Sequence, residues 1–452
     1  MVDILYEFNS EIEMSRKYLK SVHKEFQHEK KVGIIDVIKI LSERAILDYI
    51  EKNEPEALQN NYSTEHKENI MKMTQNMIKK EGIAKKIYET LIVEVDEGTI
   101  GVRSSSPGLI NLFDKDSDDN EIEDLYIFKS VLYNLCSSVE NVFSKTLKDY
   151  YLNIDKSDEI NKQSISLSEL KELGSVQDAE ELLIEKKVEG IFYKSFSQWY
   201  EEIVEKLKLR ELKKESLISD ELKHINDLFL IRNLYIHNEG IVNDKFRNKC
   251  IIYTDYQKGD KFDLNYSFLD ENIERISNVV YFFIYEYYFS KYTNRDIAQE
   301  NFNHLNSILI DKLETGPESI GKIYYSLSDN KNLPHSTKIM SLINYYIYLY
   351  HNGRDYEKEL SENDFSAFEL QFKMAKSILL NNDISYQYEL IETFINDIDE
   401  DFFFMVYDWP LMKIAKNNDD SIKRLLKDKL MGIIEINNDV ENSEEEYDIE
   451  HE

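Results

Sequence analysis

The scarcity of glycine and proline constrains the fold more than any other feature of this sequence. The chain of 452 residues contains 13 glycines and 5 prolines. Sandwiches, barrels and collagen-like arrays all need frequent turn residues, so this composition disfavours them. Hydrophobic residues make up 42% of the chain, which is enough to build cores and excludes a disordered acidic polymer. We therefore expect a mainly α-helical protein with about two to four domains.

The net charge of −32 limits what the chain can bind. Affinity for phosphate comes mainly from clustered lysine and arginine, so nucleic-acid chemistry would need a locally different surface. The window from Glu201 to Cys250 is the candidate for it, because ten bases there balance ten acids while the rest of the chain is strongly negative. Its candidate RNA contacts are Lys206, Lys208, Arg210 and Lys213. The same spacing is also typical of a solvated helical face, which is the simpler interpretation of these four residues alone.

The cysteine content and the hydropathy pattern indicate a cytoplasmic protein. Two cysteines, Cys136 and Cys250, cannot form a disulfide framework, which favours a reducing compartment. The N-terminal residues mix acids and bases and lack the apolar segment of a signal peptide. The most apolar run, Val279 to Phe289, is interrupted at Glu286 and is shorter than the ~18 residues of a membrane helix. We expect no membrane contact.

Composition shifts divide the chain into four regions. The acidic run from Asp114 to Asp124 reads as a flexible linker, because it lacks the glycine and the bidentate glutamate of a calcium loop. Small β-hairpins are expected at Ile92 to Val102 and around Lys258 to Asp260. The expected regions are 1–118, a helical region with the first hairpin; 119–292, a central helical bundle; 293–436, a helical array; and 437–452, an acidic tail.

The segment from Ser216 to Gly240 is the most informative part of the sequence. It reads as a helix that ends at Gly240, with apolar residues on one face. These are Ile218, Leu222, Ile225, Phe229 and Ile236. Arg232 shares that face, and a buried guanidinium needs a partner, so we expect a carboxylate, a phosphate or a second subunit opposite it. Two such helices across a two-fold axis would enclose a cleft with two arginines and two histidines.

The motif Arg232-Asn233-Leu234-Tyr235-Ile236-His237, followed by Asn238-Glu239-Gly240, resembles the signature helix of the HEPN superfamily. In that family an earlier core helix often carries an acid facing the arginine, and Glu140 in SSVENVF occupies the corresponding place. The resemblance covers roughly Asp124 to Tyr292, about a third of the chain. It implies a central HEPN-like helical bundle.

The resemblance also implies a function: metal-independent cleavage of RNA by attack of the ribose 2′-hydroxyl. Its catalytic residues would be Arg232, Asn233, His237 and Glu140, with no metal and no cofactor. An imidazole exchanges protons near neutral pH, and a guanidinium offers donors to a phosphate. Toxins and anti-phage abortive-infection effectors of this family have such a domain in a homodimer. A regulatory protein would then bind the C-terminal helical array.

A second interpretation remains open, because many family members are not catalytic. Arg232 and Glu140 would then form a buried structural bridge, and His237 would be a core histidine. The protein would be a scaffold that binds a protein or nucleotide partner. No other catalytic signature competes with these two: the nine histidines form no HExxH motif, and the chain has neither a phosphate-binding loop nor GxGxxG.

Overall fold

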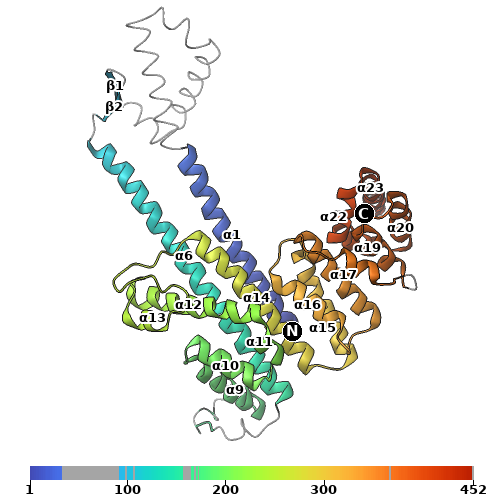
Figure 1. Ribbon diagram of the computed structural model, residues 1–452, viewed down its shortest axis with the longest axis horizontal. Coiled ribbons are helices and arrows are strands. Elements are labelled where there is room, and N and C mark those ends of the chain that lie inside the picture. Colours follow the sequence, from blue (N-terminus) through green and yellow to red (C-terminus); the bar gives the residue numbers. More distant parts are fainter. Residues whose placement is uncertain are drawn as a thin grey trace, which may run out of the picture. The chain divides into compact units, whose positions relative to one another are not determined.

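The computed structural model describes residues 1–32, 91–96, 99–104, 107–155, 164–166, 169, 171, 173–365 and 368–449. The chain forms two compact units: a larger one of residues 1–13, 134–262 and 271–452, and a smaller one of residues 14–133 and 263–270. Within the described ranges, one two-stranded sheet accompanies the helices (Figure 1), so the expected mainly α-helical fold is confirmed. No helix of this described part is both long and apolar enough to cross a membrane.

The smaller unit contains most of helix α1 (Val2–Val32), a hairpin and the first part of helix α6 (Pro107–Asp149). Strands β1 (Leu91–Asp96) and β2 (Thr99–Ser104) pair antiparallel, with Val93 opposite Val102. The spacing of apolar residues predicts a helix from Glu7 to Ile50 and a second one at about 65–88, and helix α1 confirms the start of the first. The continuation of that helix past residue 32, and a second helix expected at 65–88, lie outside the described residues.

Helix α6 corrects the expected linker. Residues 114–124 are helical, and the boundary expected at residue 118 falls inside α6. The physical reason is the absence of breakers: residues 109–149 contain no glycine or proline, so nothing in the backbone stops the helix. The high charge of residues 114–124 predicted contact with solvent, and a segment in contact with solvent can still form a helix.

The larger unit continues from the end of α6 through a π-helical turn, Tyr150–Ile154. Its further helices are α9 (Val176–Phe192), α10 (Phe196–Lys206), α11 (Arg210–Lys214), α12 (Ser216–Asn238), α13 (Asp244–Lys249), α14 (Tyr266–Lys291, of which 266–270 belong to the smaller unit), α15 (Arg295–Leu309), α16 (Glu318–Ser328), α17 (His335–His351), α18 (Glu357–Glu362), α19 (Leu370–Leu379), α20 (Ile384–Asp397), α21 (Glu400–Asp408), α22 (Pro410–Asn418) and α23 (Asp420–Ile449). Neighbouring helices pack together, α16 on α17 and α19 on α20. The acidic tail expected from residue 437 is helical as far as Ile449.

An aromatic cluster joins the helices that carry the candidate site. Phe143 of α6 stacks on Phe283 of α14 with ring centroids 3.9 Å apart. Phe196 of α10 stacks on Phe229 of α12 at 4.9 Å. Trp199 contacts both Phe143 and Phe196 at 5.2 and 4.8 Å, so it links the two pairs. Because large aromatic side chains dominate the energy of a core, this cluster holds α12 against α6 and α10.

The segment after α12 differs from the expectation of two short strands. Residues 250–262, all of them described, contain no strand beyond an isolated bridge between Ile241 and Lys261. The backbone N–H groups of Ile251 and Ile252 donate instead to the carboxylate of Asp227. Since these donors are already satisfied by a side chain, a ladder between strands does not form. The expected second hairpin is therefore wrong.

A close approach of α16 and α17 leads to a stability prediction. A Cβ added to Gly321 would lie 2.5 Å from the Tyr348 ring, which is 2% exposed. We expect Gly321→Ala to lower the free energy of unfolding by about 1–3 kcal/mol through overpacking, measured by urea denaturation. The matched control is Gly190→Ala in α9, where an added Cβ meets nothing within 4 Å. There the higher helix propensity of alanine should stabilise by about 0.5–1 kcal/mol, and equal effects of both changes would contradict the packing argument.

Candidate active-site cleft beside helix α12

A cleft of about 730 Å³ lies beside α12 in the larger unit. It is bounded by residues 192–201, which run from the end of α9 into α10, and by side chains of α12 and α6. A capping box fixes the start of α10, because Ser195 and Gln198 satisfy each other's backbone donors. The aromatic cluster described above forms part of the floor.

Arg232 and Glu140 meet in this cleft. Arg232 Nη1 donates to Glu140 Oε1 at 3.2 Å, and the two side chains are 26% and 29% exposed. The guanidinium also lies over the Phe229 ring, 6.0 Å from its centroid. Burial raises the pKa of Glu140, and the nearby Arg232 opposes that rise. Of the three partners expected for Arg232, a carboxylate, a phosphate or a second subunit, its own chain supplies the carboxylate.

Asn233 and His237 lie on the exposed side of α12. Asn233 lines the cleft, whereas His237, one helical turn further on, does not. Because His237 is exposed, its interpretation as a core histidine is wrong. Ile236, expected on the buried face, is 47% exposed. The angle around the helix is not the cause, because Ile218 lies five full turns earlier at the same angle and is 0% exposed. What differs is that the described elements that cover Ile218 do not extend over the last turn of α12.

Helix α12 ends just before Gly240, where the sequence indicated that it would stop. Gly240 has φ +83°, and its N–H donates to the carbonyl of Leu234 at 3.1 Å. A Cβ at this position would lie 2.7 Å from the Tyr235 ring, so only glycine fits without a shift. The expected stop signal for the helix is confirmed, and His237 lies in its last turn.

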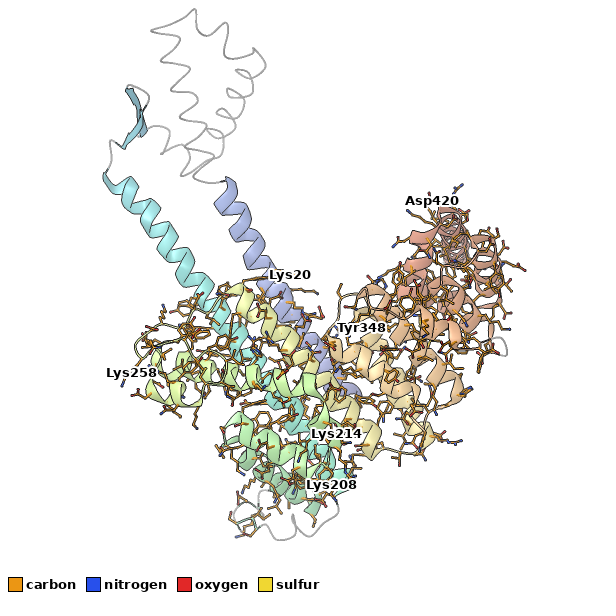
Figure 2. The ribbon with its side chains drawn as sticks, viewed as in Figure 1. Lys20, Lys208, Lys214, Lys258, Tyr348 and Asp420 are labelled. Atoms are coloured by element: carbon orange, nitrogen blue, oxygen red, sulfur yellow. The ribbon has the colours of Figure 1, made fainter. Side chains whose placement is uncertain are left out.

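The four basic residues singled out as RNA contacts do not line the cleft. Lys206 lies over the Tyr151 ring at 5.3 Å, and Lys208 is exposed between α10 and α11 (Figure 2). Arg210 and Lys213 are exposed on α11. The cationic side chains that do line it are Lys194, Lys223, Arg232 and Lys249. Only two carboxylates, Glu140 and Glu201, accompany these four cations. Lys194 pairs with Glu202 and Lys223 with Asp220, just outside the lining, so the cleft gathers cations but much of their charge is already balanced.

Two residues were missed by the sequence analysis. Asp227, 0% exposed, accepts hydrogen bonds from Ile251 and Ile252 N–H and from Cys250 Sγ, and so fixes the segment after Lys249 to α12. Burial and the Asp227 carboxylate raise the pKa of the Cys250 thiol to about 12. A sequence signal existed for Asp227, since a lone acid directly before the apolar run LFLI needs buried donors.

Tyr193 is the second missed residue. Its side chain is 88% exposed at the edge of the cleft, next to Lys194. An exposed aromatic ring beside cations is the arrangement on which unpaired bases stack. Its position in a short turn between α9 and α10 has no signature in the sequence.

Comparison of the chain with protein-family models, with curated proteins and with solved structures found no match. Assignment to the HEPN superfamily therefore stays a prediction, which rests on the residues of α12 and on the geometry around them. Among the described residues, no three His, Cys, Asp or Glu side chains are grouped so that they could hold a metal ion.

Proposed function

We propose that the protein is an endoribonuclease of the HEPN type that cleaves RNA without a metal ion. The observation that carries this proposal is the cleft: Arg232 stands there among further cations, although the chain as a whole is strongly acidic. Phosphate binding needs local positive charge, and the acidity of the remaining surface restricts RNA to this place.

The chemistry follows from the side chains. Arg232 would bind the scissile phosphate and stabilise the charge that develops on it, with Glu140 holding the guanidinium in place. The ribose O2′ attacks phosphorus, the P–O5′ bond breaks, and His237 either takes the proton from O2′ or supplies one to O5′. The products carry a 2′,3′-cyclic phosphate and a 5′-hydroxyl. Tyr193 would stack on a neighbouring base.

A homodimer would complete the site. His237 and Ile236 are both exposed on the last turn of α12, and His237 lies outside the cleft of its own chain. When two α12 helices pack across a two-fold axis, His237 of one subunit can approach the Arg232 cleft of the other. Burial of Ile236 in that contact would favour association.

The biological setting follows from the same proposal. An RNA-cleaving protein of this kind acts in the cytoplasm as a toxin or an anti-phage abortive-infection effector. Its activity then needs restraint, and the helical array from α15 onward offers a surface for a regulatory protein.

The decisive experiment compares cleavage of single-stranded RNA with and without excess EDTA. We expect equal rates in both conditions, no cleavage of DNA of the same sequence, and 2′,3′-cyclic phosphate ends detected by mass spectrometry. DNA is spared because it lacks the attacking hydroxyl. Loss of activity on chelation, or products with a 3′-hydroxyl, would contradict the mechanism.

A specific observation also favours the non-catalytic scaffold. Arg232 is already ion-paired with Glu140, and His237 does not face it within one chain. The scaffold would bind a protein or nucleotide partner, and RNA used as a probe of the cleft would be bound and left intact. Retention of RNA in a gel-shift assay, with no cleavage by the dimer, would select this second function.

A further inference from the structure

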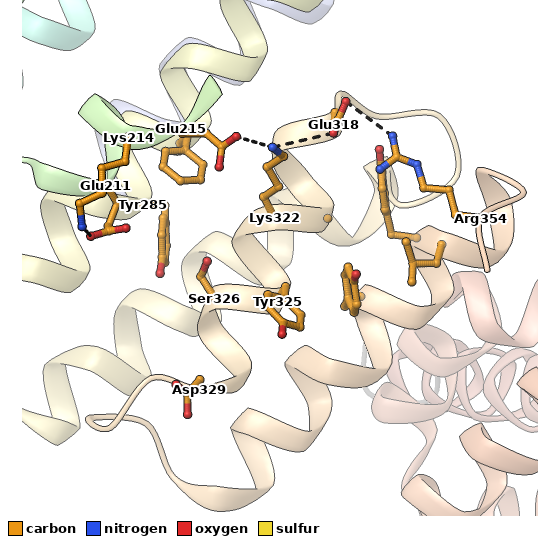
Figure 3. Close-up of a pocket in the computed structure, with 15 residues that line it drawn as sticks. Glu211, Lys214, Glu215, Tyr285, Glu318, Lys322, Tyr325, Ser326, Asp329 and Arg354 are labelled. Atoms are coloured by element: carbon orange, nitrogen blue, oxygen red, sulfur yellow. Dashed lines mark hydrogen bonds and ion pairs between the residues drawn. The ribbon is translucent and has the colours of Figure 1, made fainter. Parts of the chain in front are cut away.

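A second cavity lies away from the α12 cleft. It has a volume of about 610 Å³ and lies within the larger unit, where α11 and α14 meet α16 and α17 (Figure 3). No residue that lines the Arg232 cleft lines this cavity. A ligand bound in this cavity would therefore contact none of the residues that line the cleft proposed for RNA cleavage.

Tyrosine side chains form much of its wall. Tyr325 and Tyr345 lie with ring centroids 5.0 Å apart, and Tyr325 is 54% exposed at the opening. Tyr285 and Ser326 share a hydrogen bond, and burial raises the pKa of Tyr285 to about 12, so its phenol stays neutral. Close contact with Gly321 holds the Tyr348 ring in place. These rings present π faces, which attract cations.

The charged groups of the wall are unevenly paired. Lys322 forms ion pairs with Glu215 and Glu318, and Glu318 also pairs with Arg354 at 3.5 Å (Figure 3). Lys214, the remaining base, pairs with Glu211 at 2.8 Å. Each of the three bases is thus occupied, so an anion such as a phosphate would have to displace a carboxylate.

Asp329 is different. It is exposed at the end of α16, lines the cavity beside Tyr325 and Ser326, and forms no ion pair with another described residue. With four carboxylates and three bases, the wall carries one negative charge in excess. A cationic group that enters the cavity finds π faces and a carboxylate without having to break an existing ion pair.

We propose that this cavity binds a small organic cation with ammonium or guanidinium groups, of the polyamine class. One cationic end would lie against Tyr325 and Tyr345 and pair with Asp329, while the alkyl chain would lie along Phe282 and Leu349. The net charge of −32 further raises the local concentration of such ligands.

The test is calorimetric titration of the full-length protein with spermidine and with agmatine at 150 mM salt. We expect one site per chain for at least one of the two ligands, and about fivefold weaker binding in Asp329→Asn and in Tyr325→Leu. Both residues are exposed, so both variants should keep the fold, which thermal unfolding checks. The control is Asp397→Asn, an exposed aspartate at the end of α20, whose affinity should equal that of the wild type.

Two results would overturn the proposal. Equal affinity of all variants, with several ligands per chain, would mean diffuse attraction of polyamines to an acidic surface. Binding of ATP or inorganic phosphate that Asp329→Asn leaves unchanged, with no response to either amine, would mean that the cavity takes anions.

Discussion

Replacement of His237 by alanine is expected to slow RNA cleavage about a thousandfold under single-turnover conditions. A side chain that transfers a proton in the transition state contributes a factor of about 10²–10⁴ to the rate. His237 is exposed and makes no hydrogen bond to another described residue, so its removal should leave the free energy of unfolding unchanged. Cleavage rates and urea denaturation, measured on the same preparation, separate lost chemistry from lost structure.

A control and a mixing experiment sharpen this prediction. His335→Ala, at an exposed position of α17, should cleave RNA like the wild type. If the site is shared between subunits, equal amounts of Arg232→Ala and His237→Ala chains should recover about a quarter of the wild-type activity. Half of the dimers are then mixed, and each mixed dimer has one intact site. A mixture as inactive as its components would place both residues of a site on one chain.

Replacement of Asp227 by alanine is expected to lower the free energy of unfolding by about 2–4 kcal/mol. The carboxylate is 0% exposed and accepts the N–H groups of Ile251 and Ile252, which would be left without an acceptor. A fully buried orphaned donor costs about 1–3 kcal/mol; Ile251 is 52% exposed and Ile252 is half-buried, so each of these two falls at the low end of that range. Urea denaturation measures the loss, and Asp255→Ala, in the same segment but exposed, should change stability by less than about 0.5 kcal/mol.

Cysteine labelling gives the same variant a second readout. Asp227 raises the pKa of Cys250 both by accepting its thiol hydrogen and by its charge. Without Asp227 that pKa falls and the segment loosens, so Cys250 should react faster with iodoacetamide near neutral pH. Unchanged reactivity together with unchanged stability would show that Asp227 does not anchor the segment.

Much of the helical organisation could be read from the sequence. Few breakers predicted helices, and Gly240 predicted the end of α12 because a positive φ after the last turn suits glycine. The same reasoning failed at residues 114–124, where charge indicated a linker but the continuous helix α6 forms. Charge shows that a segment is solvated, and the backbone of a solvated segment can still be helical.

The candidate site also has features that the sequence predicted and features that it did not. Periodicity along α12 placed Arg232 on the apolar face, and the cost of a buried guanidinium called for a partner, either a carboxylate, a phosphate or a second subunit. Within one chain that partner is Glu140, which only the family resemblance had pointed to. Periodicity did not place Ile236 correctly, because it gives the angle of a residue around the helix but not how far along the helix the neighbouring elements cover that face. Periodicity also did not show that Lys194 and Lys249, which are 55 residues apart in the sequence, line the same cleft.

The sequence by itself determined the helices, the end of α12 and the need of Arg232 for a partner, because these depend on groups a few residues apart. Only the tertiary structure decided which cations gather around Arg232, that Asp227 satisfies the donors of an expected strand, and that tyrosines of α14, α16 and α17 wall a second cavity. Those outcomes depend on helices far apart along the chain, whose packing is set by the fit of side chains such as Phe143, Trp199 and Tyr348.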